Sequence, residues 1–367
     1  MGTARSSHNS VVVIMGPTGA GKSALALELA KVHNGEIISA DSRQIYTEMD
    51  IGTDKIAPRS SAKLQAPKSK QAPSAKLQAS NTTGLEFGSW DLFGISDLEF
   101  EISRDQPLLV EGVPHYLIDI LTPDQWYSAA EFRDDAQRLI TDIHRRRKLP
   151  IVVGGTGFYI RVLTGHRSLP NVPPDPAFRA WADTQPVETL ARELRERAPD
   201  VYATVDNLNN KRRVIRALEI AGSRGKKQEA AGSSHDAIPP TAYSLLPTAD
   251  KFFKLALMPS PDTLHERLAR RVEEQFRRGF AEEVRRLAAQ YGESAPGLQA
   301  VGYRQMLPYL REETTLEEAK QAVLRAHREY ARRQLTWLKK EPDLVRATSP
   351  EEARRTVTEF LRRKDSR

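Results

Sequence analysis

The sequence contains no cysteine, and none of its apolar runs approaches the roughly 20 residues that a membrane-spanning helix needs. The absence of cysteine excludes disulfides and thiolate metal sites, and the eight histidines lack the close spacing of a zinc site. Residues 1–10 are polar and no secretory apolar segment follows them, so a cytoplasmic protein without a membrane partner is expected. Any metal should then be Mg²⁺ held together with phosphate.

The remaining composition is that of a globular protein with an excess of positive charge. The 367 residues suffice for two domains or for one large α/β domain with insertions, and 39% of them are hydrophobic. The formal net charge of +7 favours an anionic partner. A solvated helix face explains each basic cluster taken alone, but several together favour an RNA or DNA surface. The clusters lie at residues 145–148, 211–216, 267–271, 277–278 and 325–340.

The most specific motif is a glycine-rich loop between an apolar run at residues 11–15 and a helical pattern at residues 24–32. The loop consists of Gly16, Pro17, Thr18, Gly19, Ala20, Gly21, Lys22 and Ser23. In such a loop the glycines allow backbone N–H groups to face an anion, Lys22 can reach phosphate oxygens, and Ser23 can hold Mg²⁺. The loop therefore predicts a site for a di- or triphosphate. It does not name the reaction, because kinases, nucleotide hydrolases and some transferases share it.

Strand-like and helical segments alternate around this loop. Apolar runs predict strands at residues 11–15, 36–39, 116–120 and 151–153, with helices at 23–32 and 129–147 between them. This alternation predicts an α/β fold in which a P-loop parallel sheet is flanked by helices. A further apolar run at residues 254–258 would return the chain to the same sheet. Amphipathic helices are expected at residues 263–278, 281–291, 316–340 and 350–363.

Two stretches interrupt this pattern. Residues 167–250 carry charged helical segments and no convincing core strand, which predicts an inserted, mostly helical domain. The segment 57–110 repeats SAKLQA, and it is basic up to residue 80 and acidic beyond it. This composition favours a loosely ordered insertion, with an RNA-contacting basic arm as the alternative. The expected division is residues 1–171 for the first part of the core, 172–250 for the helical domain and 251–367 for the second part of the core.

Polar side chains follow the ends of two expected strands. Asp41 comes just after the strand at residues 36–39, and ligands of open α/β sheets bind at that edge. A carboxylate in this position can accept a proton from a nucleophile, hold Mg²⁺, or cap a turn. The Gly-Gly-Thr run that ends at Thr156 follows the strand at 151–153. Its glycines would let the backbone approach a ligand, or would simply form a tight turn.

A basic pair lies in the expected helical domain. Arg212 and Arg216 are four residues apart and so share one helix face. That spacing suits a diphosphate or RNA phosphates, although an exposed basic face has the same spacing.

These segments together resemble the tRNA dimethylallyltransferases, also called tRNA isopentenyltransferases, in their bacterial form. The resemblance covers most of the chain in the right order, apart from the segment 57–110, which this family usually lacks. It rests on GPTGAGKS (16–23), DSRQIY (41–46), MDIGT (49–53), HYLID (115–119), YSAAEF (127–132), GGT (154–156), RRVIRALE (212–219), VGYRQM (301–306) and RRQLTW (332–337).

The resemblance implies transfer of a dimethylallyl group from dimethylallyl diphosphate to N6 of the adenosine 3′ of a tRNA anticodon. The P-loop would bind the leaving diphosphate, with Lys22, Mg²⁺ on Ser23, and Arg216 stabilising its charge. Asp41 would orient the adenine amine and accept its proton, and Thr156 would contact the reacting nucleotide or its phosphate.

The resemblance also implies a tRNA anticodon stem-loop as partner, gripped in part by the inserted helical domain. The residues expected to contact it are Asp41, Ser42, Arg43, Gln44, Thr156, Arg179, Arg212, Arg213, Arg216, Gln299, Val301, Gly302, Tyr303 and Arg304. Tyr303 and Phe158 are candidates for stacking on bases, or core residues. A monomer is expected.

Three alternatives remain beside this function. An adenylate isopentenyltransferase would perform the same chemistry on free AMP, ADP or ATP, although the basic helical regions do not favour it. A small-molecule kinase is supported by the P-loop alone. Non-enzymatic RNA binding fits the charge but leaves the intact P-loop unexplained.

Overall fold

The computed structural model describes residues 10–56, 106–167, 169, 172, 175–205, 207–230 and 252–365. The chain divides into two compact units, one formed by Met1–His166 with Ala249–Arg367 and the other by Arg167–Thr248. In the described ranges no helix combines the length and the apolar character needed to cross a membrane.

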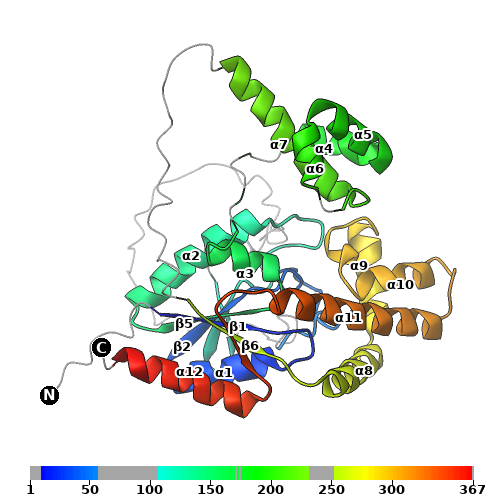
Figure 1. The fold of residues 1–367 in the computed structure, drawn as a ribbon. Coiled ribbons are helices and arrows are strands. Elements are labelled where there is room, and N and C mark those ends of the chain that lie inside the picture. The colour runs from blue at the N-terminus through cyan, green and yellow to red at the C-terminus, as the bar shows by residue number, and fades with distance from the viewer. Residues whose placement is uncertain are drawn as a thin grey trace, which may run out of the picture. The chain divides into compact units, whose positions relative to one another are not determined.

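Among the described residues, the first unit is built on a seven-stranded sheet in the order β3-β4-β2-β5-β1-β6-β7. Figure 1 labels β2, β5, β1 and β6 of this sheet. The strands are β1 (Val11–Met15), β2 (Gly35–Ser39), β3 (Leu108–Val110), β4 (Val113–Tyr116), β5 (Leu149–Gly154), β6 (Phe252–Leu257) and β7 (Leu344–Ala347). All neighbouring pairs are parallel except the β3–β4 hairpin. The predicted α/β fold with a mostly parallel sheet is therefore confirmed.

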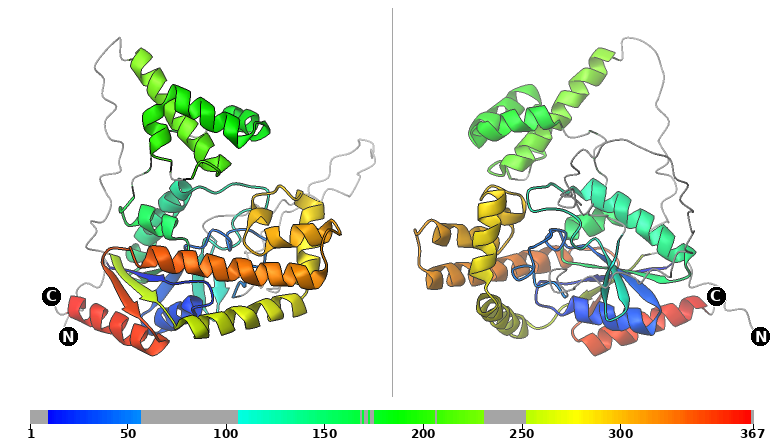
Figure 2. Two further views of the ribbon diagram at one scale, coloured as in Figure 1. Left: turned by 45° about the vertical axis from the view of Figure 1, so that its right-hand side comes forward. Right: turned by 180° about the vertical axis from the view of Figure 1, so that it is seen from behind.

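Helices cover both faces of the sheet (Figures 1 and 2). In both figures α1 and α12 lie together on one face, and α2 and α3 lie on the other. The α2 helix starts where the Ser128 hydroxyl accepts the Glu131 N–H and the Glu131 carboxylate accepts the Ser128 N–H, a capping box. The helices of this unit are α1 (Lys22–Val32), α2 (Ala129–Arg145), α3 (Gly157–Leu163), α8 (Pro261–Arg277), α9 (Phe280–Tyr291), α10 (Tyr303–Leu310), α11 (Leu316–Leu338) and α12 (Pro350–Asp365).

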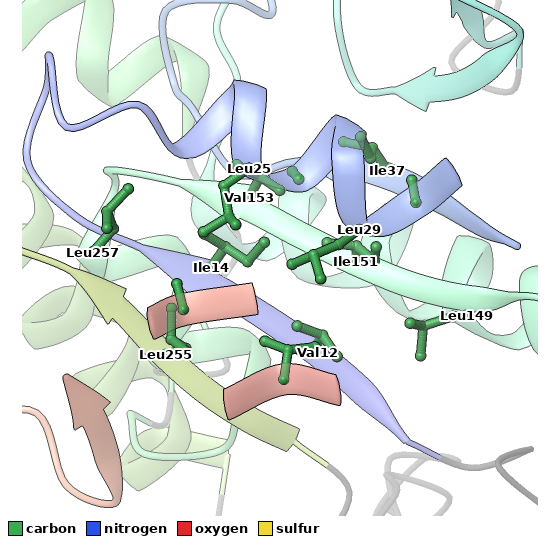
Figure 3. Close-up of a cluster of buried hydrophobic side chains, with 14 of the residues drawn as sticks. Val12, Ile14, Leu25, Leu29, Ile37, Leu149, Ile151, Val153, Leu255 and Leu257 are labelled. Carbon is green, nitrogen blue, oxygen red and sulfur yellow. The ribbon is translucent and has the colours of Figure 1, made fainter. Parts of the chain in front are cut away.

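One hydrophobic core lies between the sheet and the α1–α12 layer (Figure 3). Ile14 of β1 and Ile151 of β5 are fully buried there against Leu25 and Leu29 of α1. Burial of each such side chain contributes about 1.5–3 kcal/mol of transfer free energy. This packing holds α1 on the sheet, and thereby places the loop between β1 and α1 at the carboxyl edge of the strands.

The structure differs from the predicted elements mainly around β4. The strand expected at residues 116–120 is instead β4, because Leu117 and Asp119 have left-handed φ angles of 59° and 55° that end the extended backbone. The last residues of the segment predicted as an insertion form β3, so the change in composition at residue 110 lies inside the sheet. Residues 57–105 of that segment lie outside the described residues.

The described residues of the second unit form helices that are joined by turns and short loops. Its helices are α4 (Pro176–Thr184), α5 (Val187–Arg197), α6 (Pro199–Ala203) and α7 (Lys211–Ala230). They bury a core of their own, which includes Leu190, Leu194, Val201 and Leu218. A separate core is what an independently packed helical module requires.

Candidate active site

A cavity of about 520 Å³ opens at the carboxyl edge of β1, β2 and β5, in the first unit. Parallel strands direct their carboxyl ends to one edge, so the loops that follow β1 and β2 share this space. The charged and hydroxyl-bearing residues that line it include Thr18, Lys22, Ser23, Asp41, Arg267 and Arg271. The predicted meeting of the P-loop with Asp41 is therefore present in the structure.

The P-loop backbone depends on its glycines. Gly16 has a φ of 153°, and a β-carbon there would lie 2.6 Å from the Leu257 carbonyl oxygen. Gly21 has a φ of 94° and precedes the first residue of α1 without any side-chain cap. The N–H groups of the first turn of α1 thus lack a side-chain acceptor, and such a helix start attracts anions.

Lys22 lies at the start of α1 and turns back along the loop. Its Nζ donates a hydrogen bond to the Pro17 carbonyl oxygen at 2.8 Å. Burial lowers the pKa of Lys22 to about 8, with the Asp41 carboxylate opposing that change and the Arg271 guanidinium adding to it. A bound anion would favour the charged ammonium, so this site is tuned to a negatively charged ligand.

Asp41 stands in the turn after β2. Its Oδ1 accepts the Arg43 N–H at 3.0 Å, which stabilises the turn. The same carboxylate lines the cavity beside Lys22. Turn capping and contact with a ligand are thus compatible, because a carboxylate has several acceptor positions.

Thr156 joins this turn to the loop after β5. Its Oγ1 accepts the Ser42 N–H at 3.1 Å and lies 3.3 Å from the Ser42 hydroxyl, to which it donates. The Thr156 hydroxyl therefore positions the residue next to Asp41.

The glycines around Thr156 make room for protein groups. A β-carbon at Gly154 would collide with the Ala40 backbone, and one at Gly155 with the Gln334 amide. At Gly157 it would collide with the Trp337 ring. Of the two explanations for this glycine run, the tight packing of the turn is the one that these contacts support.

Gln334 of α11 is a site residue that the sequence interpretation missed. Its Oε1 accepts the Thr18 N–H of the P-loop at 2.8 Å, and its Nε2 donates to the Gly155 carbonyl oxygen at 3.0 Å. One buried amide thus links the two loops of the site. The only sequence signal was its place in the RRQLTW segment.

Arg267 and Arg271 of α8 were also missed, having been noted only as part of a basic cluster. Arg267 Nη1 donates to the Ala20 carbonyl oxygen at 3.1 Å. Arg271 Nη1 donates to the Thr18 hydroxyl at 3.2 Å. Their spacing of four residues puts both guanidinium groups on the helix face that meets the P-loop.

His115 of β4 is a further lining residue that the sequence did not single out as a site residue. It is buried, and its Nδ1 donates to the Val113 carbonyl oxygen at 2.9 Å. Burial lowers the pKa of this imidazole, although the bond to Val113 opposes the change. The ring is therefore neutral and presents Nε2 as an acceptor.

The segment that contains the predicted RNA contacts 299–304 packs against residues 50–53. Tyr303 is fully buried, and its hydroxyl donates to Glu283 Oε1 at 2.6 Å. Glu283 also accepts the N–H groups of Asp50, Ile51 and Gly52. Of the two alternatives for Tyr303, its burial supports the core residue over the side chain that stacks on bases. Phe158, the other stacking candidate, is 48% exposed.

The remaining predicted contacts of this segment differ in exposure. Arg304 is exposed, whereas Gly302 is buried with a φ of 97°. Gln299 and Val301 are half-buried, and Gln299 Nε2 donates to the Glu293 carbonyl oxygen at 2.8 Å. Arg304 is thus the charged side chain of this segment that is open to a partner.

Four predicted arginines belong to the second unit. Arg179 and Arg216 both donate to the buried Glu219, Arg179 Nε at 2.7 Å and Arg216 Nη1 at 2.8 Å. Burial opposes ionisation, but these two bonds hold the pKa of Glu219 below its ordinary value. Arg216 also donates to the Val172 carbonyl oxygen at 2.7 Å. Arg212 and Arg213, the other two, have exposed side chains.

Comparison with known proteins gives matches along nearly the whole chain. The family described as IPP transferase matches residues 102–341, and the family described as isopentenyl transferase matches residues 9–66. A tRNA dimethylallyltransferase of Thermomicrobium roseum is 37% identical over 365 residues, which cover 96% of this chain and 92% of that protein. A tRNA dimethylallyltransferase 1 of Citrifermentans bemidjiense is 37% identical over 91% of this chain and 90% of its own length. The crystal structure of a tRNA isopentenylpyrophosphate transferase from Bacillus halodurans matches with a TM-score of 0.60 and 29% identity, over 98% of each chain.

Proposed function

The chain belongs to the IPP transferase family, and on that premise we propose that it is a tRNA dimethylallyltransferase. It would move a dimethylallyl group from dimethylallyl diphosphate to N6 of the adenosine 3′ of a tRNA anticodon and release diphosphate. The relatives named tRNA dimethylallyltransferase favour a tRNA acceptor over free AMP, ADP or ATP, and favour prenyl transfer over phosphoryl transfer.

One observation carries the chemical part of this proposal: Asp41 and the P-loop residues Lys22 and Ser23 line a single cavity. A diphosphate bound at the P-loop leaves a carbon atom, and the attacking amine must lose a proton. Binding of the leaving group and acceptance of the proton therefore require a cationic cradle and a carboxylate side by side. The cavity supplies both.

The reaction is an alkyl transfer in which no phosphoryl group moves. The bond between C1 of the dimethylallyl group and the bridging oxygen breaks, and its electron pair stays on the diphosphate. The lone pair of N6 forms the new C–N bond, and Asp41 accepts the N6 proton. Lys22 and the N–H groups at the start of α1 stabilise the charge that grows on the diphosphate.

Mg²⁺ fits this site only together with the diphosphate. The Ser23 hydroxyl lines the cavity, while the described residues contain no group of three or more His, Cys, Asp or Glu side chains able to hold a metal. Ser23 and phosphate oxygens would therefore hold the ion, which would add positive charge beside the leaving group.

The acceptor adenosine must leave the stack of the anticodon loop to reach Asp41. Exposed basic residues such as Arg304 in the first unit and Arg212 and Arg213 in the second unit would contact tRNA phosphates. Arg179 and Arg216 would contribute to tRNA binding chiefly in an indirect way. They pair with Glu219 in the core of the helical unit and so stabilise that unit.

The test is prenyl transfer from labelled dimethylallyl diphosphate to unmodified tRNA, with AMP as the competing acceptor. The wild-type protein should label tRNA, and Lys22→Ala and Asp41→Asn should lose about 100-fold or more of that rate. Asp343→Asn, which changes a side chain that is 87% exposed, is the matched control and should keep the full rate. Transfer to AMP alone would instead identify an adenylate isopentenyltransferase.

A further inference from the structure

We infer that Arg267 and Arg271 of α8 form the second half of the diphosphate site, opposite the N–H groups of the P-loop. This inference rests on the proposed function, because it assigns residues to the same leaving group. Beside Arg216, the residue that the family resemblance suggested, it names two guanidinium groups on a helix more than 50 residues further along the chain.

The first support is position. Both arginines line the cavity together with Lys22. They reach the P-loop from outside it, Arg267 at the Ala20 carbonyl oxygen and Arg271 at the Thr18 hydroxyl. A β-carbon at Gly21 would lie 3.8 Å from Arg267 Nη1, so this guanidinium group lies directly beside the loop backbone. Phosphate oxygens cradled by the loop would therefore be within reach of both side chains.

The second support is charge. Four cationic side chains, Lys22, Lys55, Arg267 and Arg271, line the cavity, and Lys55 is already paired with Asp50 and Asp119. The carboxylates that line it with them are Asp41 and Asp54. Asp54 is 48% exposed and lies 3.5 Å from Arg271, a long ion pair that solvent weakens. The cations outnumber the carboxylates, and a multiply charged anion would restore the balance.

The third support is the mutual influence of these cations. Arg271 opposes protonation of Lys22, so the two groups destabilise each other while no anion lies between them. A diphosphate relieves this repulsion, and a guanidinium group offers planar paired donors that match phosphate oxygens. Because the negative charge on the diphosphate grows as the C1–O bond breaks, the same contacts are stronger in the transition state than with the intact donor.

Asp54 is a built-in competitor in this arrangement. Its carboxylate pairs with Arg271 in the structure, and a bound diphosphate would compete for the same guanidinium group. Removal of the Asp54 charge should therefore strengthen diphosphate binding, whereas removal of the Arg271 charge should weaken it. The two substitutions should therefore change the affinity for diphosphate in opposite directions. A general disturbance of the fold would lower the affinity in both variants.

The experiment is calorimetric titration of the full chain with inorganic pyrophosphate in the presence of Mg²⁺. Arg271→Gln and Arg267→Gln should each weaken the affinity about tenfold or more, the amount that one charge-assisted contact contributes. Asp54→Asn should strengthen it about threefold, since only a weak ion pair is lost. Arg270→Gln, on the exposed side of the same helix, is the matched control and should leave the affinity unchanged.

Prenyl transfer to tRNA, measured with the same proteins, separates this inference from the proposed function. A wild-type protein that binds pyrophosphate but does not prenylate tRNA would refute the proposed function alone. Wild-type activity on tRNA with unchanged pyrophosphate affinity in both Arg271→Gln and Arg267→Gln would refute the role of α8. Weaker binding in Asp54→Asn would refute the competition between Asp54 and the diphosphate.

Discussion

His327 of α11 is a buried histidine whose two ring nitrogens have no hydrogen-bond partner within the part of the chain that the structure describes. It lies against Gly302, where an added β-carbon would be 3.4 Å from its Nε2. Burial, together with the nearby Arg271 guanidinium, lowers the pKa of His327 from 6.5 to about 3. The folded protein therefore holds this ring neutral down to about pH 3.

The lowered pKa of His327 makes the free energy of unfolding depend on pH. The unfolded chain binds a proton at this ring below pH 6.5 and the folded chain does so only near pH 3, so the unfolded state gains protons first as the pH falls. This difference has no effect on stability above the unfolded pKa, and it lowers the stability of the folded protein progressively as the pH falls below 6.5. Between pH 7 and pH 5 the loss amounts to about 2 kcal/mol, since each pH unit below the unfolded pKa costs about 1.4 kcal/mol.

The variant His327→Leu removes the titrating group and keeps an apolar side chain of similar size. We expect its free energy of unfolding to fall by about 2 kcal/mol less than that of the wild-type protein between pH 7 and pH 5. At pH 7 the variant should be at least as stable, because two buried polar atoms without partners are removed.

Urea unfolding followed by circular dichroism at the two pH values measures this difference. His265→Gln, which changes an exposed histidine of α8, is the control and should behave like the wild-type protein. Equal losses of stability in the wild-type protein and in His327→Leu would refute the argument, because His327 would then be protonated in the folded state.

Three further predictions concern the P-loop and the packing around it. Pyrophosphate affinity, measured by calorimetry, should fall as the pH rises through about 8, where Lys22 loses its proton, and Lys22→Met should lack that step. Gly157→Ala should lower the free energy of unfolding, measured by thermal denaturation, by about 1–3 kcal/mol, because the added methyl group would collide with the Trp337 ring. Gly222→Ala, at a position of α7 with open space around it, should raise the same free energy by about 0.5–1 kcal/mol. Glu283→Gln should cost about 2–4 kcal/mol in urea unfolding, because the carboxylate accepts three backbone N–H groups.

Much of the P-loop and of the turns beside it could be predicted from local sequence patterns. A strand, a glycine-rich loop and a helix follow one another within residues 11–32, and the structure has them there as β1, the loop and α1. Asp41 and Thr156 were placed beside the loop because parallel strands end at a common edge, and their turns do meet there. The family was also predicted from motifs in their order along the chain, and the comparisons confirm it.

The long-range contacts of Gln334 and Tyr303 could not be predicted from the residues next to them in the chain. Gln334 bonds to Thr18, 316 residues away, and nothing near either residue in the chain indicates that pairing. The aromatic ring of Tyr303 could stack on a base or pack in a core. Its burial depends on the Glu283 carboxylate and on the surrounding core, which the residues next to it in the chain do not reveal.

The α/β fold, the P-loop, the place of Asp41 and the family could all be predicted from the chain alone, because each depends on a short pattern or on a fixed order of motifs. The contacts that α8 and α11 make with the site through Arg267, Arg271 and Gln334 appear only once the chain is folded. The residues of a helix indicate which of its faces is apolar, but they do not indicate which distant loop its polar face will contact. That choice is made when the helices pack, and it depends on the shape and charge of both partners at once.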